Sequence, residues 1–166
     1  VRDLAAFEAA FATAQARLGP VQVLLNNAGL ARQADLLTGD PERWRELLEV
    51  NVLALAAGTR FAIEQMRAAG RGHVFHLSSM SGHRIPAGSG GMYAATKHAV
   101  RALTEVHRQE LQRAGLPIRI TALSPGFVKT EFVHTLFECD AAEAERIYAD
   151  LHCLAPDDVA DALVYA

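Results

Sequence analysis

The chain has 166 residues, of which 51% are hydrophobic and 21% are charged, and its formal net charge is −3 at pH 7. These values are typical of a globular protein, and we expect residues 1–166 to form a single domain. The slightly acidic balance argues against nucleic acid or an anionic membrane as a partner. No apolar run approaches the roughly 20 residues that span a bilayer.

The cysteine content and the chain ends bear on location and completeness. Cys139 and Cys153 form neither a disulfide framework nor a metal-binding spacing, and no signal-peptide pattern is present, so a cytoplasmic protein is predicted. The chain begins with Val1 and ends at Ala166, and each end interrupts a helical pattern. We therefore expect a fragment of a longer protein.

The first half of the chain predicts two helices around one strand. Residues 3–18 carry apolar side chains at helical spacing and end at Gly19-Pro20. Residues 21–25 form a nearly continuous apolar run, which is typical of a strand covered on both faces. Asp40 followed by Pro41 marks a helix start, and the long helix is expected to end near residues 69–70.

The second half repeats the alternation of strand and helix. Strands are predicted at 73–77 and 118–123, and helices at 92–114, 141–152 and 157–166, with 127–140 irregular. Strands separated by helices indicate an α/β fold with a doubly wound parallel sheet. Ligands of such sheets lie beyond the carboxyl ends of the strands.

Each predicted strand ends in polar or glycine-containing sequence: 26–29 (NNAG), Ser78-Ser79, and 124–126 (SPG). These three segments therefore meet at one edge, where the helix carrying Tyr93 also begins. Tyr93 and Lys97 are four residues apart, which places a phenol and an ammonium on one helix face. Because a positive charge within ~4–6 Å favours the phenolate, we expect Lys97 to lower the pKa of Tyr93.

Together these motifs resemble one family. NNAG at 26–29, Asn51 within LLEVNVLAL, Ser79 within LSSMSG, YAATK at 93–97 and SPGFVKTEF at 124–132 are similar to the motifs of classical short-chain dehydrogenases/reductases. The local text further resembles the branch of cytosolic NADP-dependent carbonyl and hydroxysteroid reductases and insect farnesol-type dehydrogenases. The resemblance covers essentially the whole chain and implies a Rossmann-like fold.

The resemblance implies an oxidoreductase that interconverts a carbonyl and an alcohol on a small-to-medium apolar substrate. Tyr93 would be the general acid or base, and Lys97 would lower its pKa and bind the nicotinamide ribose. Ser79 would hydrogen-bond the substrate oxygen, and Asn51 would bend its helix and hold a water that links Lys97 to solvent. Ser79 is preferred to Ser78 because it lies three residues before a glycine, although its separation from Tyr93 is one residue longer than is usual, which leaves Ser78 open.

The resemblance also implies a nicotinamide cofactor, with NADP(H) favoured over NAD(H). Tyr93 and Lys97 would contact it, together with two groups at the strand ends. The adenosine-side ribose would lie near Asn27, Ala28 and Gly29, and the nicotinamide near Pro125, Gly126, Val128 and Thr130. Candidate substrate-pocket walls are His83, Met92, Phe127 and Phe132, with an apolar lid at 127–153.

One family feature is absent from these 166 residues, the glycine-rich turn T-G-x-x-x-G-x-G that holds the pyrophosphate. We therefore expect the Rossmann-like sheet to lack its first βαβ half, residues 1–166 alone to be inactive, and the strand at 21–25 to promote aggregation. An alternative hypothesis is a non-catalytic truncated relative that acts as a partner-binding domain. The full-length protein is expected to form a homodimer or homotetramer through the helices at 41–69 and 92–114.

The histidines raise two further alternatives. His73 and His76 would face opposite sides of a strand, so they are not expected to share a metal, and no metal site is predicted. A serine hydrolase using Ser79 and His83 lacks both the G-x-S-x-G turn and a placed acid.

Overall fold

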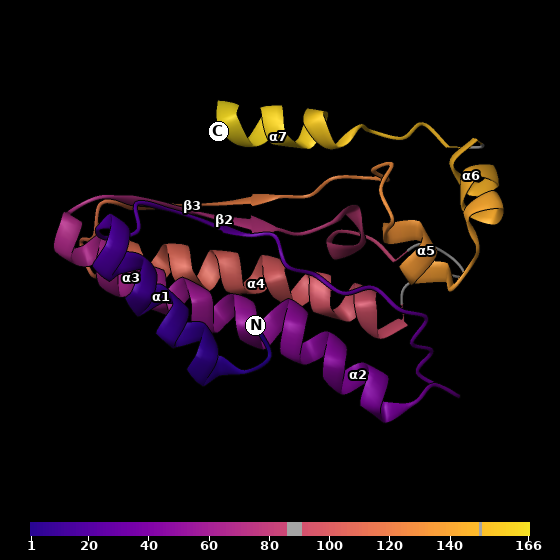
Figure 1. The fold of residues 1–166 in the computed structure, drawn as a ribbon, viewed down its shortest axis with the longest axis horizontal. Coiled ribbons are helices and arrows are strands. Elements are labelled where there is room, and N and C mark those ends of the chain that lie inside the picture. Colours follow the sequence, from indigo (N-terminus) through magenta and orange to yellow (C-terminus); the bar gives the residue numbers. More distant parts are fainter. Residues whose placement is uncertain (86–90, 150) are drawn as a thin grey trace.

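The computed structural model describes residues 1–85, 91–149 and 151–166. Helices and strands alternate along most of the chain (Figure 1). The strands are β1 (Val23–Asn26), β2 (Gly72–Leu77) and β3 (Ile118–Leu123). The helices are α1 (Leu4–Leu18), α2 (Pro41–Leu48), α3 (Ala54–Ala69), α4 (Gly91–Arg113), α5 (Phe132–Phe137), α6 (Ala141–Ala149) and α7 (Pro156–Tyr165), with a π-helix η1 (Glu49–Leu53) and a 3-10 turn η2 (Met80–Gly82).

The three strands form one parallel sheet in the order β1-β2-β3. Val74 at the centre pairs with Leu24 on one side and with Ile120 on the other. The predicted α/β fold with a parallel sheet is confirmed. All three strands end at the same edge, since parallel strands run in one direction.

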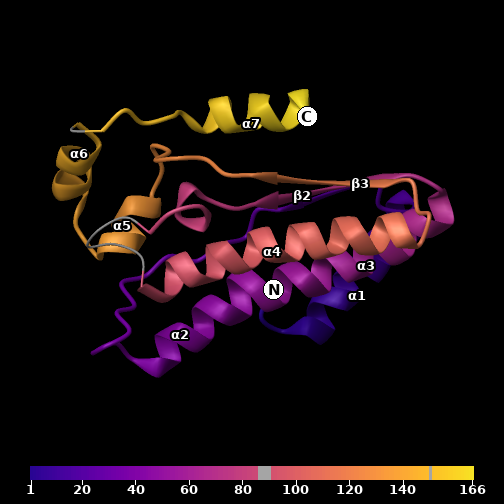
Figure 2. The same ribbon diagram turned by 180° about the vertical axis from the view of Figure 1, so that it is seen from behind.

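The two faces of the sheet are covered unequally. Figures 1 and 2 show α1, α3 and α4 on one face and α7 alone on the other. The main apolar cluster lies between the sheet and α3 and α4, and α7 contributes no buried residue. On β1, Val23 is 60% exposed and Leu25 is 43% exposed. The first strand, which the sequence predicts to be covered on both faces, therefore leaves apolar side chains of one face exposed in residues 1–166.

Local sequence explains the helix ends. The Asp40 carboxylate accepts a hydrogen bond from the Glu42 N–H and caps α2, with Pro41 at the first helical position. Gly70 ends α3 in the left-handed conformation, with φ of 67°, which glycine adopts at little cost.

The structure differs from the predicted elements in three places. The long helix expected at 41–69 is interrupted by the π-helix at Glu49–Leu53, around the mediocre helix former Asn51. The segment predicted to be irregular contains α5, which is stabilised by burial of Val133 and Leu136. The first strand begins at Val23 rather than at residue 21.

Candidate active site

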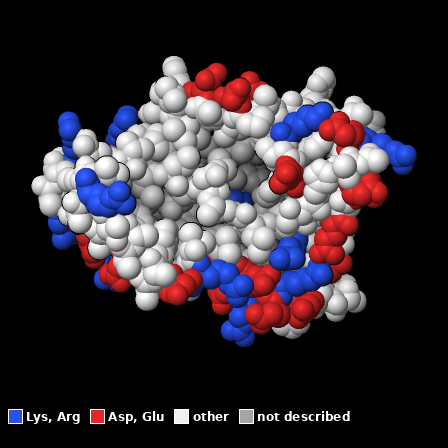
Figure 3. Space-filling view, in the orientation of Figure 1, with Lys and Arg blue, Asp and Glu red and all other residues white. Residues whose placement is uncertain are grey.

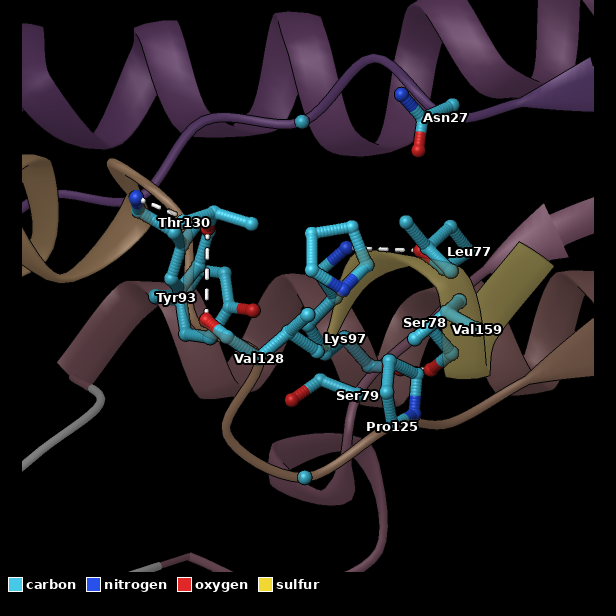
Figure 4. Close-up of a pocket in the computed structure, with 14 residues that line it drawn as sticks. Asn27, Leu77, Ser78, Ser79, Tyr93, Lys97, Pro125, Val128, Thr130 and Val159 are labelled. Atoms are coloured by element: carbon cyan, nitrogen blue, oxygen red, sulfur yellow. Dashed lines mark hydrogen bonds between the residues drawn. The ribbon is translucent and has the colours of Figure 1, made fainter. Parts of the chain in front are cut away.

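A cavity of about 410 Å³ lies beyond the carboxyl ends of the strands, where the sequence predicts a site. Figure 3 shows a hollow in this face, with charged side chains gathered mainly around the rim. Nine of the expected site residues line the cavity together: Asn27, Gly29, Ser79, Tyr93, Lys97, Pro125, Gly126, Val128 and Thr130. Residues as distant in sequence as 27 and 130 therefore converge on one volume (Figure 4).

Several expected residues lie elsewhere. Ala28 lines a separate cavity of about 150 Å³ behind β1, and Asn51 is buried behind the site. Of the four candidate pocket walls, only Phe132 borders the main cavity in the described part of the chain. Met92 packs against the cluster around Tyr93 instead, and the His83 ring contacts the Ser124 hydroxyl. Four further residues line the cavity. No motif indicated Leu77, Pro156 or Val159, and Ser78 was the alternative to Ser79.

Tyr93 is a buried phenol in the first turn of α4. Burial raises its pKa to about 12, because the charged phenolate loses hydration, while a hydrogen bond with the Ser79 side chain acts in the opposite direction. The expected lowering by Lys97 is therefore not found in this structure. Tyr93 keeps its proton, which is the state that a general acid requires.

Lys97 lies on the same face of α4 as Tyr93, as its spacing predicts. Its Nζ is 5.7 Å from the centre of the Tyr93 ring and donates a hydrogen bond of 2.9 Å to the Leu77 carbonyl. The ammonium thus lies over the ring face and is held by the end of β2. Burial lowers the pKa of Lys97 to about 8, because the charged form is the one that loses hydration.

The two serines after β2 have different partners. Ser78 is buried, and its hydroxyl donates to the Lys97 carbonyl at 3.3 Å. Ser79 Oγ accepts from the Ser81 N–H at 3.1 Å, and the Ser79 side chain also forms a hydrogen bond with Tyr93 in the cavity. The hydrogen bonding therefore favours Ser79 as the serine that contacts substrate.

Gly82 explains how closely η2 approaches α4. A Cβ atom at this position would lie 2.6 Å from the Lys97 carbonyl oxygen and 2.9 Å from Ser78 Oγ. The Gly82 carbonyl in turn accepts a hydrogen bond of 3.0 Å from Arg101. The absence of a side chain therefore allows Ser79 to lie next to the helix turn that carries Lys97.

Asn51 supports the site from within the core. Its Oδ1 accepts from the Leu30 N–H at 2.7 Å, and its Nδ2 donates to the Leu30 carbonyl and to the Thr96 hydroxyl. Thr96 then donates to the Tyr93 carbonyl at 2.7 Å. Asn51 thus links the loop after β1 to the first turn of α4, while the water relay expected from the resemblance stays a prediction.

The cavity suits the nicotinamide end of a dinucleotide. It combines apolar walls from Leu77, Pro125 and Val128 with the ammonium of Lys97, which can bind hydroxyl groups of a ribose. A Cβ on Gly29 would lie 3.8 Å from both Lys97 Nζ and Asn51 Oδ1, an ordinary contact distance, so Gly29 lies next to the Lys97 end of the cavity. The chemistry of these residues therefore fits the cofactor that the motifs imply.

Other features of the described residues limit the alternatives. Within residues 1–85, 91–149 and 151–166, no group of three His, Cys, Asp or Glu side chains could hold a metal ion. His76 contacts Thr59 and Thr104, whereas His73 contacts Thr121, so the two rings have separate partners. No helix in the described segments has both the length and the apolar character needed to cross a membrane.

These features define an α/β protein with a Ser-Tyr-Lys site at the carboxyl edge of a parallel sheet. The family model for short chain dehydrogenase matches residues 1–141, and the chain belongs to this family. It is 44% identical over 158 residues to dehydrogenase/reductase SDR family member 11 of Bos taurus, covering 93% of this chain and 62% of that protein. It is 36% identical over 159 residues to farnesol dehydrogenase of Aedes aegypti, covering 93% and 61%.

The structural comparison agrees. A serine dehydrogenase complexed with NADP+ superposes with a TM-score of 0.90 at 32% identity, over 99% of this chain and 66% of that one. The chain therefore spans roughly three fifths to two thirds of the length of the relatives it matches.

Proposed function

We propose that the protein containing this chain is an NAD(P)(H)-dependent oxidoreductase that reduces a carbonyl or oxidises the corresponding alcohol. The observation that carries the proposal is the convergence of Ser79, Tyr93 and Lys97 on one cavity with an apolar wall. The bound nicotinamide cofactor supplies or accepts the hydride. The residues of this chain bind the substrate oxygen and move the proton.

Reduction starts with Tyr93 protonated, in keeping with its raised pKa. Ser79 donates a hydrogen bond to the carbonyl oxygen, where negative charge develops. As the carbonyl carbon gains the hydride, Tyr93 transfers its proton to the oxygen and becomes a phenolate. The Lys97 ammonium is proposed to bind the nicotinamide ribose beside that phenolate, and alcohol oxidation follows the same path in reverse.

NADP(H) is favoured over NAD(H) as cofactor. The support is the likeness to a serine dehydrogenase complexed with NADP+ and to an NADP-dependent 3-hydroxy acid dehydrogenase of Shigella flexneri, which is 33% identical. Pro125, Gly126, Val128 and Thr130 are proposed to contact the nicotinamide, and Asn27, Ala28 and Gly29 the adenosine-side ribose. A small-to-medium apolar substrate is favoured because Val128 and Phe132 border the cavity.

Self-association through the helices at 41–69 (α2, η1 and α3) and through α4 is part of the proposal. Leu48, Leu53 and Val106 are exposed apolar residues, and a groove of about 560 Å³ lies along the same helices. A homodimer or homotetramer would bury this surface.

Two free cysteines, Cys139 and Cys153, support a cytoplasmic location.

A cofactor oxidation assay tests the proposed function. The protein from the complete reading frame is mixed with NADPH or NADH and with a panel of apolar aldehydes and ketones, and loss of nicotinamide absorbance is followed. We expect turnover with at least one carbonyl compound, faster with NADPH, and none for residues 1–166 alone. Absence of turnover and of NADPH binding by the complete protein would favour the non-catalytic, partner-binding alternative.

A further inference from the structure

Tyr148 is a buried phenol on α6 that the catalytic mechanism does not use. Its ring packs in a small cluster with Val133 and Ala144, and its side chain does not line the main cavity. A buried phenol hydroxyl needs a hydrogen-bond partner, because burying it unpaired costs free energy. The partners of this hydroxyl indicate what Tyr148 does.

Among the described residues, the Tyr148 hydroxyl contacts the backbone of residues 128–130, which we call the wall segment. Tyr148 Oη lies 2.6 Å from the Thr130 carbonyl oxygen and 3.2 Å from the Val128 carbonyl oxygen. It also accepts a hydrogen bond of 3.2 Å from the Thr130 N–H. The single hydroxyl proton is shared between the two carbonyls, with the shorter contact to Thr130, and the oxygen accepts from the Thr130 N–H. One side chain thus contacts three backbone groups of a segment that has no helical or sheet ladder of its own.

The wall segment contacts Tyr148 on one side and borders the main cavity on the other. Val128 and Thr130 both line the cavity, and Figure 4 shows them on the side of the Tyr93 ring. The Thr130 hydroxyl oxygen accepts a hydrogen bond from the Phe132 N–H at 3.2 Å. Phe132 in turn packs on Tyr93, with ring centres 5.7 Å apart. A shift of the wall segment would therefore move both the cavity wall proposed to contact the cofactor and the Phe132 ring beside Tyr93.

The wall segment and its neighbour Phe127 are also held by two backbone hydrogen bonds and one ion pair. Lys129 N–H donates to the Leu154 carbonyl at 2.9 Å, and Leu154 N–H donates to the Phe127 carbonyl at 2.8 Å. An exposed ion pair joins Lys129 to Glu145 on α6. Since exposed ion pairs contribute little, the buried Tyr148 hydroxyl is the main side-chain tie.

We infer that Tyr148 is a positioning residue, whose hydroxyl holds residues 128–130 in the form that receives the nicotinamide end of the cofactor. This inference rests on the proposed function and adds a residue that does not touch the cofactor. It requires that removal of one oxygen atom loosens the wall segment and weakens NADPH binding. It also requires that this removal changes neither the fold nor the proton transfer by Tyr93.

The test compares Tyr148→Phe with two control variants in the protein from the complete reading frame. Tyr165→Phe removes a hydroxyl from a side chain that is 95% exposed, and Glu145→Gln removes only the exposed ion pair on the same helix. The readouts are hydrogen–deuterium exchange of the peptide around residues 127–133, NADPH binding by nicotinamide fluorescence, and steady-state kinetics. Phenylalanine keeps the buried ring, so the variant is expected to fold.

For Tyr148→Phe we expect faster exchange of the Thr130 amide without NADPH, about tenfold weaker NADPH binding, and a kcat with an unchanged pH profile. Both controls should match the wild type. Unchanged exchange and unchanged NADPH binding in Tyr148→Phe would overturn the inference, and so would faster exchange with unchanged NADPH binding. A wild-type protein that binds NADPH but reduces no carbonyl contradicts the proposed function only, because exchange and binding still measure the role of Tyr148.

Discussion

The two sides of the cavity are held in different ways. The catalytic floor, residues 77–82 and 91–101, is fixed by buried side chains that bind backbone groups of the neighbouring element, such as Ser78 to Lys97 and Lys97 to Leu77. The cap, residues 127–149 and 151–154, is fixed by the Tyr148 hydroxyl and by backbone contacts at Leu154. The groups that we propose to move protons therefore lie on the densely bonded side, and the apolar ring of Phe132 lies on the sparsely bonded side.

Because the two sides are held differently, we expect them to have different roles. Proton transfer needs groups held within a few tenths of an ångström, which a packed helix and strand provide. Recognition of an apolar substrate tolerates a less firmly held surface, as is typical of loops that carry specificity. Changes in the floor should therefore alter turnover or stability, and changes in the cap should alter binding.

The largest effect is expected at the lysine of the floor. Replacing Lys97 with Met keeps the buried aliphatic stem but removes the charge beside Tyr93, so kcat should fall by about 10² to 10³-fold. The matched control is Lys129→Met, because Lys129 is the other lysine in the chain and its side chain is exposed in the cap. Cofactor oxidation assays measure both. Equal activity of the two variants would contradict the role of Lys97.

The next largest effect is expected at His76, a buried side chain of β2. Burial, with a smaller contribution from His107, lowers the pKa of His76 from 6.5 to about 4. Below pH 6.5 the unfolded chain binds a proton that folded His76 does not, so stability present above pH 6.5 is lost as pH falls toward 4. His76 should contribute a loss of up to about 3 kcal/mol in the free energy of unfolding.

Urea titrations at pH 7 and at pH 4.5 measure this loss. His76→Gln should show a shallower pH dependence than the wild type, whereas His152→Gln at an exposed position should not. Burial also lowers the pKa of His73 and of His107. These two histidines remain in every variant, so part of the pH dependence of the free energy of unfolding should remain as well. Parallel pH dependences for His76→Gln and the wild type would exclude His76 as a source.

A smaller effect is expected where η2 meets α4. Gly82→Ala places a methyl group 2.6 Å from the Lys97 carbonyl oxygen and should lower the free energy of unfolding by about 1–3 kcal/mol. Gly126→Ala is the stability control, because a Cβ there has no atom within 4 Å. Chemical denaturation compares the two. Equal stability would show that η2 can move away from α4 without cost.

The smallest effect belongs to the cap. Phe132→Ala should raise KM for an apolar carbonyl substrate about three- to fivefold and change kcat less, since it removes apolar contact area next to Tyr93. Phe127→Ala is a matched control, because Phe127 has similar exposure but does not line the cavity. A larger fall in kcat than in affinity would place Phe132 in the proton-transfer step.

Much of the fold could be predicted because strand and helix patterns in this chain are strong. The apolar runs gave three strands, and Asp40 with Pro41 marked the start of α2 correctly. The helix α5 was missed because its sequence, FVHTLF, has poor intrinsic helix propensity and is stabilised by tertiary burial of Val133 and Leu136. The resemblance implied a bend at Asn51, but the sequence did not show that the bend is a π-helix, since this geometry depends on hydrogen bonds to Leu30 and Thr96.

The site was predictable as far as motifs reach. Tyr93 and Lys97 follow from helical spacing, and their convergence with Ser79 follows from the strand ends. The direction of the Tyr93 pKa was not predictable, because the degree of burial depends on distant residues such as Phe132. Thr96 lies within YAATK and Tyr148 lies within the predicted lid, but neither pattern predicts their contacts with Asn51 and with the backbone of residues 128–130.

The proton-donor role of Tyr93 is tested most directly by single-turnover carbonyl reduction in the protein from the complete reading frame. Tyr93→Phe removes the phenol hydroxyl, and Tyr165→Phe removes one from an exposed side chain. We expect the rate of Tyr93→Phe to fall by at least about 10²-fold with NADPH binding retained, and that of Tyr165→Phe to be unchanged. If Tyr93→Phe keeps most of the wild-type rate, Tyr93 is not the proton donor.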